Sequence, residues 1–209
     1  NVASGCRRIP AVCFACATFP TWNAYPAMLA SLATGNAVIV KPHPTAILPM
    51  ALAVRTCREV LAAAGFSPDL VTLCLDSVEA PVGKLLVKHP QAAIIDFTGS
   101  ARFGAWVEAN AHPALCYSET SGVNTVVVES VDQLEPVLKS LATTMSLFSA
   151  QMCTSPQNVY VPRDGVRHAG GRIDADEFGA RLAQAIASIA ADPKRAAPIM
   201  AAIQSSSTP

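Results

Sequence analysis

Residues 11–41 read AVCFACATFPTWNAYPAMLASLATGNAVIVK, and this stretch sets the pattern for the first half of the chain. The uninterrupted apolar run Ala11–Ala17 is typical of a buried β-strand. Helical periodicity follows over Pro20–Thr34, and proline is well tolerated at the first position of a helix. A second apolar run, Asn36–Lys41, predicts another strand. The stretch therefore predicts one strand–helix–strand unit.

The same alternation continues to about residue 121. The expected elements are a helix at Ala46–Ala64 that Gly65 ends, a strand at Leu70–Leu75, a helix at Val78–Lys88, a strand at Ala92–Phe97, a helix at Ala101–Ala111 and a strand at Ala114–Ser118. Nearly continuous apolar strands are typical of a parallel sheet with helices on both faces. We therefore predict an α/β fold, a Rossmann-like doubly wound parallel sheet, for residues 1–121.

The rhythm changes after Gly122, and residues 122–209 look like the start of a second α/β domain. The expected elements are a strand at Val123–Glu129, a helix at Val131–Ser149, a strand at Asn158–Pro162, a loop at Pro162–Gly171 and a helix at Asp174–Ala191.

Composition excludes some classes of function. The chain has 209 residues, of which 51% are hydrophobic, and 15 basic residues balance 15 acidic ones. We therefore expect no positive electrostatic field that would attract nucleic acid or anionic lipid. No apolar stretch reaches the roughly 20 residues of a membrane span. The sequence starts without Met and without a signal segment, so we expect a fragment of a longer protein.

Seven cysteines, an odd number within mostly apolar runs, favour a reducing cytoplasm. The Cys13-x-x-Cys16 spacing matches redox and zinc motifs, but it lies in an apolar run without a second ligand pair, so a buried strand is the better interpretation. The four histidines are scattered, and no metal site is expected.

Ligands of doubly wound sheets bind beyond the carboxyl ends of the strands, so the chemistry is expected there. Four groups of residues stand out, three of them after strands of the first half: Lys41 to Pro44, Thr98-Gly99-Ser100 with Gly104, Glu119 to Gly122, and Gln151 to Thr154. In order and spacing, these groups resemble the aldehyde dehydrogenase superfamily from about Pro10 to Val161.

The resemblance implies a nucleophile and a base. Cys153 lies in an Ala-Gln-Met-Cys segment similar to the family's Gly-Gln-x-Cys, and Glu119 precedes it by 34 residues, as the family's glutamate does. A thiolate is the competent form of a cysteine nucleophile. The implied reaction adds Cys153 to an aldehyde, passes a hydride to nicotinamide, and releases a carboxylic acid when Glu119 activates water.

The resemblance also implies a site for NAD or NADP. Lys41, followed by Pro42, resembles the lysine that binds the adenosine ribose. The Thr98-Gly99-Ser100 turn with Gly104 resembles the segment where a helix begins at the pyrophosphate, and free N–H groups of a first helical turn suit that role. Gly122 matches a glycine of the loop under the nicotinamide. Many relatives have Glu where this chain has Pro44, so the choice between NAD and NADP stays open.

The oxyanion donor has two candidates. In the family an asparagine of a Trp-Asn-Phe-Pro-like segment holds the oxyanion. Asn23 follows Trp22 and is favoured, whereas an ungapped match puts Thr18 in the asparagine's place.

Finer similarities leave three alternatives for function. Lys41-Pro42-His43-Pro44 is similar to coenzyme-A-acylating aldehyde dehydrogenases, which generally lack the glutamate. With Glu119 present, the chain most resembles the aldehyde dehydrogenase-like protein of bacterial phenylacetate breakdown, which implies oxidation of a ring-cleavage semialdehyde or a related step on a small-molecule aldehyde. The alternatives are the coenzyme-A-acylating enzyme and an inactive, truncated nucleotide-binding relative. Family members are commonly homo-oligomers, and we expect the same of the full-length protein.

Overall fold

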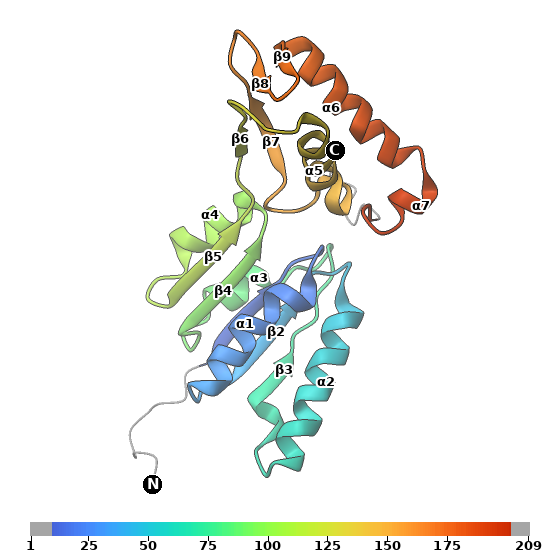
Figure 1. The fold of residues 1–209 in the computed structure, drawn as a ribbon. Coiled ribbons are helices and arrows are strands. Elements are labelled where there is room, and N and C mark those ends of the chain that lie inside the picture. The colour runs from blue at the N-terminus through green and yellow to red at the C-terminus, as the bar shows by residue number, and fades with distance from the viewer. Residues whose placement is uncertain (1–9, 202–209) are drawn as a thin grey trace. The chain divides into compact units, whose positions relative to one another are not determined.

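A five-stranded parallel sheet with the strand order β3-β2-β1-β4-β5 organises the first part of the chain (Figure 1). The computed structural model describes residues 10–201. The elements of this part are β1 (Ala11–Ala15), α1 (Pro20–Ala33), β2 (Val38–Pro42), α2 (Ile47–Ala63), a short 3₁₀ turn (Pro68–Leu70), β3 (Val71–Leu73), α3 (Gly83–Val87), β4 (Ile94–Gly99), α4 (Ala101–Asn110) and β5 (Leu115–Thr120). The expected doubly wound α/β sheet is confirmed.

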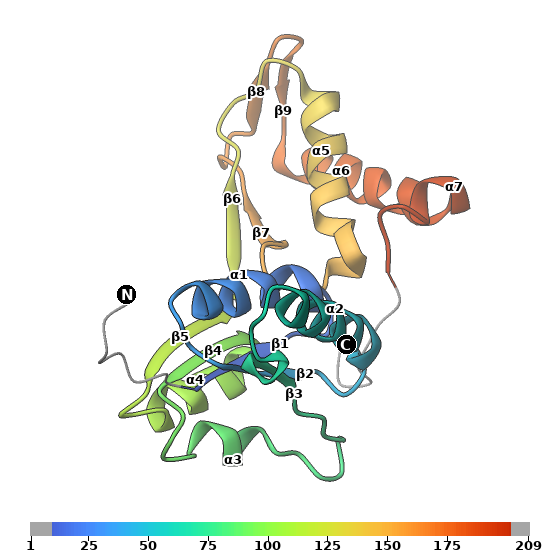
Figure 2. The same cartoon turned by 90° about the horizontal axis from the view of Figure 1, so that it is seen from below.

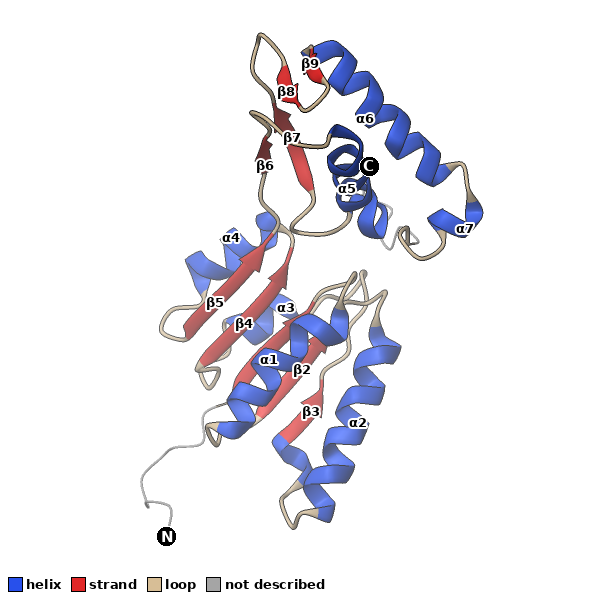
Figure 3. Cartoon of the chain, in the orientation of Figure 1, coloured by secondary structure: helices blue, strands red, loops and turns tan. Residues whose placement is uncertain are grey.

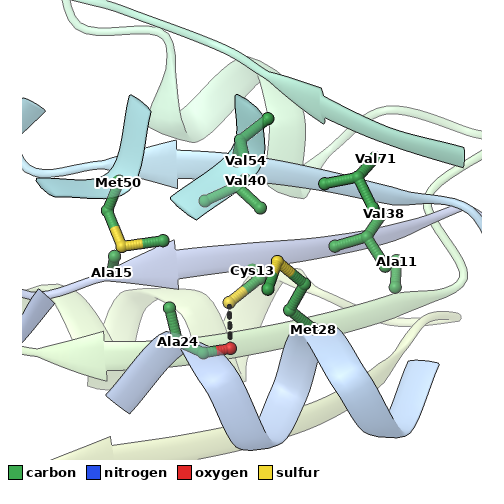
Figure 4. Packing of buried hydrophobic residues seen from close by; sticks show 10 residues of the cluster. All are labelled: Ala11, Cys13, Ala15, Ala24, Met28, Val38, Val40, Met50, Val54 and Val71. Atoms are coloured by element: carbon green, nitrogen blue, oxygen red, sulfur yellow. Dashed lines mark hydrogen bonds between the residues drawn. The ribbon is translucent and has the colours of Figure 1, made fainter. Parts of the chain in front are cut away.

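Helices cover both faces of the sheet, α1 and α2 on one and α3 and α4 on the other (Figure 2). The central strand β1 is buried on both sides because its residues alternate between two cores. Ala11, Cys13 and Ala15 pack with Met28 of α1 and Met50 of α2 (Figure 4). Val12 and Phe14 belong to the opposite core, with Val107 of α4.

Two details of the first part differ from the expectation. Strand β5 is not covered on both faces, because Leu115 and Tyr117 are 60% and 59% exposed at the sheet edge. The helix expected at Val78–Lys88 begins only at Gly83. A proline at position 81 disfavours helical backbone before it, and the Asp76 side chain accepts from the Val82 N–H (3.1 Å), which stabilises an irregular turn instead.

The chain divides into two units, residues 1–120 and 121–209. The second contains β6 (Asn124–Val127), α5 (Leu134–Ser146), a turn (Leu147–Ala150), β7 (Pro156–Tyr160), β8 (Val166–His168), β9 (Gly171–Ile173), α6 (Ala175–Ala190) and α7 (Pro193–Ala196) (Figure 3). Strands β6 and β7 pair in parallel, and α5 and α6 share one core through Leu138, Phe178 and Ile189. The roles expected of the two domains, dinucleotide binding for 1–121 and catalysis for 122–209, stay predictions.

The loop expected at Pro162–Gly171 contains the strand β8, which pairs antiparallel with β9 at the end of the loop. Both strands are only three residues long, so they carry too little periodicity to be recognised. A tight turn at Gly165 (φ 92°) starts the hairpin, where a Cβ would lie 2.3 Å from the Ile173 carbonyl oxygen. Among residues 10–201, no helix combines the length and the apolar character that crossing a membrane requires.

Candidate active site

The carboxyl edge of the sheet gathers the residues singled out in the first unit. The chain order of the strands reverses between β1 and β4, so this is the switch point where ligands of such sheets bind. Lys41 ends β2 with Pro42, Gly99 ends β4, Thr120 ends β5, and the loop after β1 begins at Cys16. The fold thus brings the Lys41, Gly99 and Glu119 groups to one edge.

Lys41 is not a solvated side chain, because it forms an ion pair with Asp76. Its Nζ lies 2.7 Å from Asp76 Oδ1, and the two side chains are only 11% and 2% exposed. Asp76 Oδ1 accepts no hydrogen bond of good geometry, so its pairing with Lys41 is ionic. The other carboxylate oxygen of Asp76, Oδ2, accepts from the Val82 N–H. Burial, and then the charge of Lys41, lower the pKa of His43, while Asp76 opposes the change. Position 76 follows a predicted strand, but nothing in the sequence assigned it a partner.

Cys16 organises the turn between β1 and α1. Its sulfur accepts from Asn23 Nδ2 (3.3 Å) and from the Phe19 N–H (3.4 Å), and Thr18 Oγ1 lies 3.9 Å away. Both candidate oxyanion donors, Asn23 and Thr18, therefore lie beside the Cys16 thiol. One N–H of the Asn23 amide already donates to the Cys16 sulfur. The sequence interpretation missed this role, because it placed Cys16 inside the strand.

Cys13, the partner of Cys16 in the C-x-x-C spacing, is a core residue. Burial, and then the charge of Asp96, raise the pKa of its thiol to about 12. The thiol lies 3.7 Å from the Ala24 carbonyl oxygen, which it faces as a donor (Figure 4). All described cysteines are free, Cys13 and Cys16 among them, and Cys6 lies outside the described residues. With its raised pKa, the Cys13 thiol stays protonated at neutral pH and is not a nucleophile.

The turn from β4 into α4 is a capped helix start. Ser100 Oγ accepts from the Phe103 N–H (3.4 Å), while helix geometry leaves the N–H groups of Ala101 and Arg102 without an acceptor inside the helix. Gly104 permits close packing, because a Cβ there would lie 2.3 Å from Thr120 Cγ2. The backbone N–H groups of this turn can donate to an anion, and Gly104 allows α4 to pack closely against β5.

Glu119 lies on the exposed side of β5, in register with the buried Thr98 of β4. Asp96 is on the same face of β4, and burial, followed by the charge of Glu119, raises the pKa of its carboxyl group. Gly122 is open to solvent, and its carbonyl oxygen accepts from Gln157 Nε2 (3.3 Å). Glu119 is thus accessible to water.

Cys153 occupies the half-buried turn before β7 in the second unit. Asn124 fixes the main chain of this turn, because its Nδ2 donates to the carbonyl oxygens of Cys153 (2.5 Å) and Ser155 (3.2 Å). No local pattern marked Asn124, which is 29 residues from Cys153. Glu119 and Cys153 belong to different units, so their pairing stays a prediction.

Comparisons with known proteins identify relatives along most of the chain. Residues 13–207 match the family described as "Aldehyde dehydrogenase family". A solved structure of an NAD-dependent aldehyde dehydrogenase from Burkholderia multivorans is 47% identical, with a TM-score of 0.88, over 95% of this chain and 36% of that one.

Curated relatives are more distant. The "1-pyrroline-5-carboxylate dehydrogenase 2" of Halalkalibacterium halodurans is 30% identical over 162 residues, 71% of this chain and 30% of the relative. A "2-aminomuconic 6-semialdehyde dehydrogenase" of a Pseudomonas species is 30% identical over 145 residues, 68% of this chain and 28% of the relative. The chain thus spans less than a third of the length of these two relatives.

Proposed function

The chain belongs to the aldehyde dehydrogenase family, and on that premise we propose that it is part of an enzyme that oxidises an aldehyde to a carboxylic acid with NAD or NADP. The observation that carries the proposal is the order of groups at the carboxyl edge of the sheet. At that edge, Lys41 and Pro42 end β2, Ser100 caps α4, and Glu119 lies near the end of β5. In the sequence, Cys153 follows Glu119 by 34 residues.

In the proposed reaction, the Cys153 thiolate adds to the carbonyl carbon, which forms a C–S bond and an oxyanion. The amide of Asn23, with Thr18 as the alternative, donates to that oxyanion. A nicotinamide bound at this site would accept the hydride, and loss of the hydride would leave a thioester on Cys153. Glu119 then takes a proton from water, whose oxygen attacks the thioester carbon. The C–S bond breaks, the carboxylic acid leaves, and the Cys153 thiolate is restored.

The residues present fit a dinucleotide. The uncapped N–H groups at the start of α4 suit a pyrophosphate, and Thr98, Gly99 and Ser100 form the turn before it. Lys41 and Pro42 would hold the ribose side, with Gly122 in the loop under the nicotinamide. Pro44 provides no carboxylate at the ribose, so we propose either NAD or NADP as the cofactor.

We further propose a small semialdehyde of aromatic breakdown, including phenylacetate catabolism, as the substrate. The combination of the Pro42-His43-Pro44 segment with Glu119 supports it. The Pseudomonas relative is described as a 2-aminomuconic 6-semialdehyde dehydrogenase, so the substrate in its name is a semialdehyde. The same Pro-His-Pro segment favours coenzyme-A acylation as a second candidate, and turnover that requires coenzyme A would select it.

We also propose that the enzyme works in the cytoplasm as a homo-oligomer. The free thiols among the described residues suit a reducing compartment.

The test is reduction of NAD and NADP by the full-length protein with a panel of aldehydes, with and without coenzyme A. Cys153→Ala should abolish turnover, whereas Glu119→Gln should keep a first burst of hydride transfer and lose the steady-state rate. Cys57→Ala and Glu129→Gln are matched controls. Normal turnover in Cys153→Ala, or equal rates in Glu119→Gln and Glu129→Gln, would refute the assignment. No turnover in the native protein would favour the inactive relative.

A further inference from the structure

The turn before Cys153 has a left-handed backbone at three consecutive residues. Phe148, Ser149 and Ala150 have φ values of 53°, 55° and 60°, and none of them is glycine. A left-handed conformation brings the Cβ of an L-residue too close to the next carbonyl oxygen. Successive residues of this kind persist only where the surrounding structure holds them, and they concentrate at functional sites.

Contacts from the end of the described chain hold this turn. The Phe148 N–H donates to the Ile199 carbonyl oxygen (2.7 Å). The Ser149 hydroxyl donates to the Ala201 carbonyl oxygen (2.6 Å) and accepts from the Ala201 N–H (3.2 Å). In Figure 1 the segment after α7 returns to the end of α5, where the turn begins. We call these three hydrogen bonds, between residues 148–149 and 199–201, the latch.

The turn leads directly to the nucleophile. The Gln151 N–H and its Nε2 both bond to the Phe148 carbonyl oxygen (3.2 and 3.0 Å). Cys153 follows two residues later, where Asn124 fixes its carbonyl oxygen. The position of the Cys153 thiol therefore depends on whether the left-handed turn is kept.

We propose that Ser149 is a positioning residue for Cys153, because its hydroxyl binds the backbone of Ala201 and so holds a left-handed turn that would otherwise relax. This inference rests on the proposed function only through the role of Cys153. The latch residues need no contact with substrate or cofactor.

Three variants of the full-length protein test the proposal. Ser149→Ala removes the hydroxyl and keeps the Cβ, so the turn should relax. Ser149→Gly also removes the hydroxyl, but glycine adopts positive φ without a steric penalty. Ser188→Ala is the matched control, because this hydroxyl donates to the Ala185 carbonyl oxygen inside α6 (2.7 Å) and accepts from the exposed Arg195 side chain (3.1 Å), without a bond to the turn at 148–150.

We expect kcat to fall about tenfold in Ser149→Ala, as lost hydrogen bonds of ordinary strength imply, with the cofactor KM unchanged. Ser149→Gly should recover most of the rate, and Ser188→Ala should keep it. Amide hydrogen exchange of residues 147–155 should speed up about tenfold in Ser149→Ala and less in Ser149→Gly.

Equal kcat in Ser149→Ala and Ser188→Ala, or a glycine variant as slow as the alanine variant, would overturn the proposal. So would unchanged hydrogen exchange in Ser149→Ala. If Cys153→Ala stays active, the proposed function fails, while the exchange measurement still decides whether Ser149 holds the turn.

Discussion

Replacing Asp76 with alanine should strongly destabilise the first unit. The substitution leaves the ammonium group of Lys41, whose side chain is 11% exposed, without its partner at 2.7 Å. Removing one member of a buried pair typically costs about 3–5 kcal/mol, because the remaining charge is desolvated and uncompensated. The Val82 N–H also loses its acceptor, which adds about 1 kcal/mol. We therefore expect a loss of about 4–6 kcal/mol in the free energy of unfolding.

The matched control is Glu59→Ala. Glu59 pairs with Arg55 at 3.8 Å, but these side chains are 68% and 67% exposed, so the loss should stay below about 1 kcal/mol. Urea unfolding followed by tryptophan fluorescence suits the assay, because Trp22 and Trp106 both lie in the first unit. The double variant Lys41→Met, Asp76→Leu should recover most of the stability as an apolar pair. Similar losses in Asp76→Ala and Glu59→Ala would refute the reasoning.

Three further predictions concern the same unit. Gly104→Ala should cost about 1–3 kcal/mol of stability in urea unfolding, because its Cβ would meet Thr120 Cγ2 at 2.3 Å, and Thr120→Ser should relieve the clash. Asp96→Asn should raise the free energy of unfolding at pH 7 but not near pH 3. Because the pKa of Asp96 is raised in the folded protein, the protonated carboxyl group contributes fully to stability below the ordinary carboxyl pKa. This contribution is lost as pH rises through the pKa of Asp96 in the folded protein. A gain at both pH values would contradict this cause. The pKa of His43, measured by NMR titration, should rise in Lys41→Met, because the Lys41 charge lowers it; an unchanged value would show that burial alone is responsible.

The sheet was predictable because its strands are apolar on both faces. Strand β1 is fully buried from Ala11 to Ala15, and a continuous apolar run of strand length is typical of the interior of a parallel sheet. The start of α3 was not predictable from periodicity, because hydrogen bonds to the side chains of Asp76 and Ser77 stabilise the preceding turn. The short strands β8 and β9 depend on pairing with each other, which three-residue segments do not reveal.

The predicted ends of the strands indicated most residues of the candidate site, but they did not indicate which residues these side chains contact. Lys41 was found because it ends an apolar run, and the rule for parallel sheets assigns ligands to that edge. Its ion pair with Asp76 joins the end of β2 to the segment after β3, and the sequence does not indicate which acidic residue would reach it. Cys16 is the opposite case: the apolar run around it concealed that β1 ends one residue earlier, at Ala15.

The two halves of the proposed chemistry differ in how they are specified. The dinucleotide features depend on local geometry, because Ser100 caps the helix that begins at the next residue. The turn of Cys153 depends instead on contacts between residues 29 and 52 positions apart, from Asn124 and from Ala201. Substitutions far along the chain from Cys153 should therefore change the position of the Cys153 thiol, while the proposed dinucleotide-binding residues keep their local structure. This separation is why a fall in kcat at constant cofactor KM is the informative signature for Ser149.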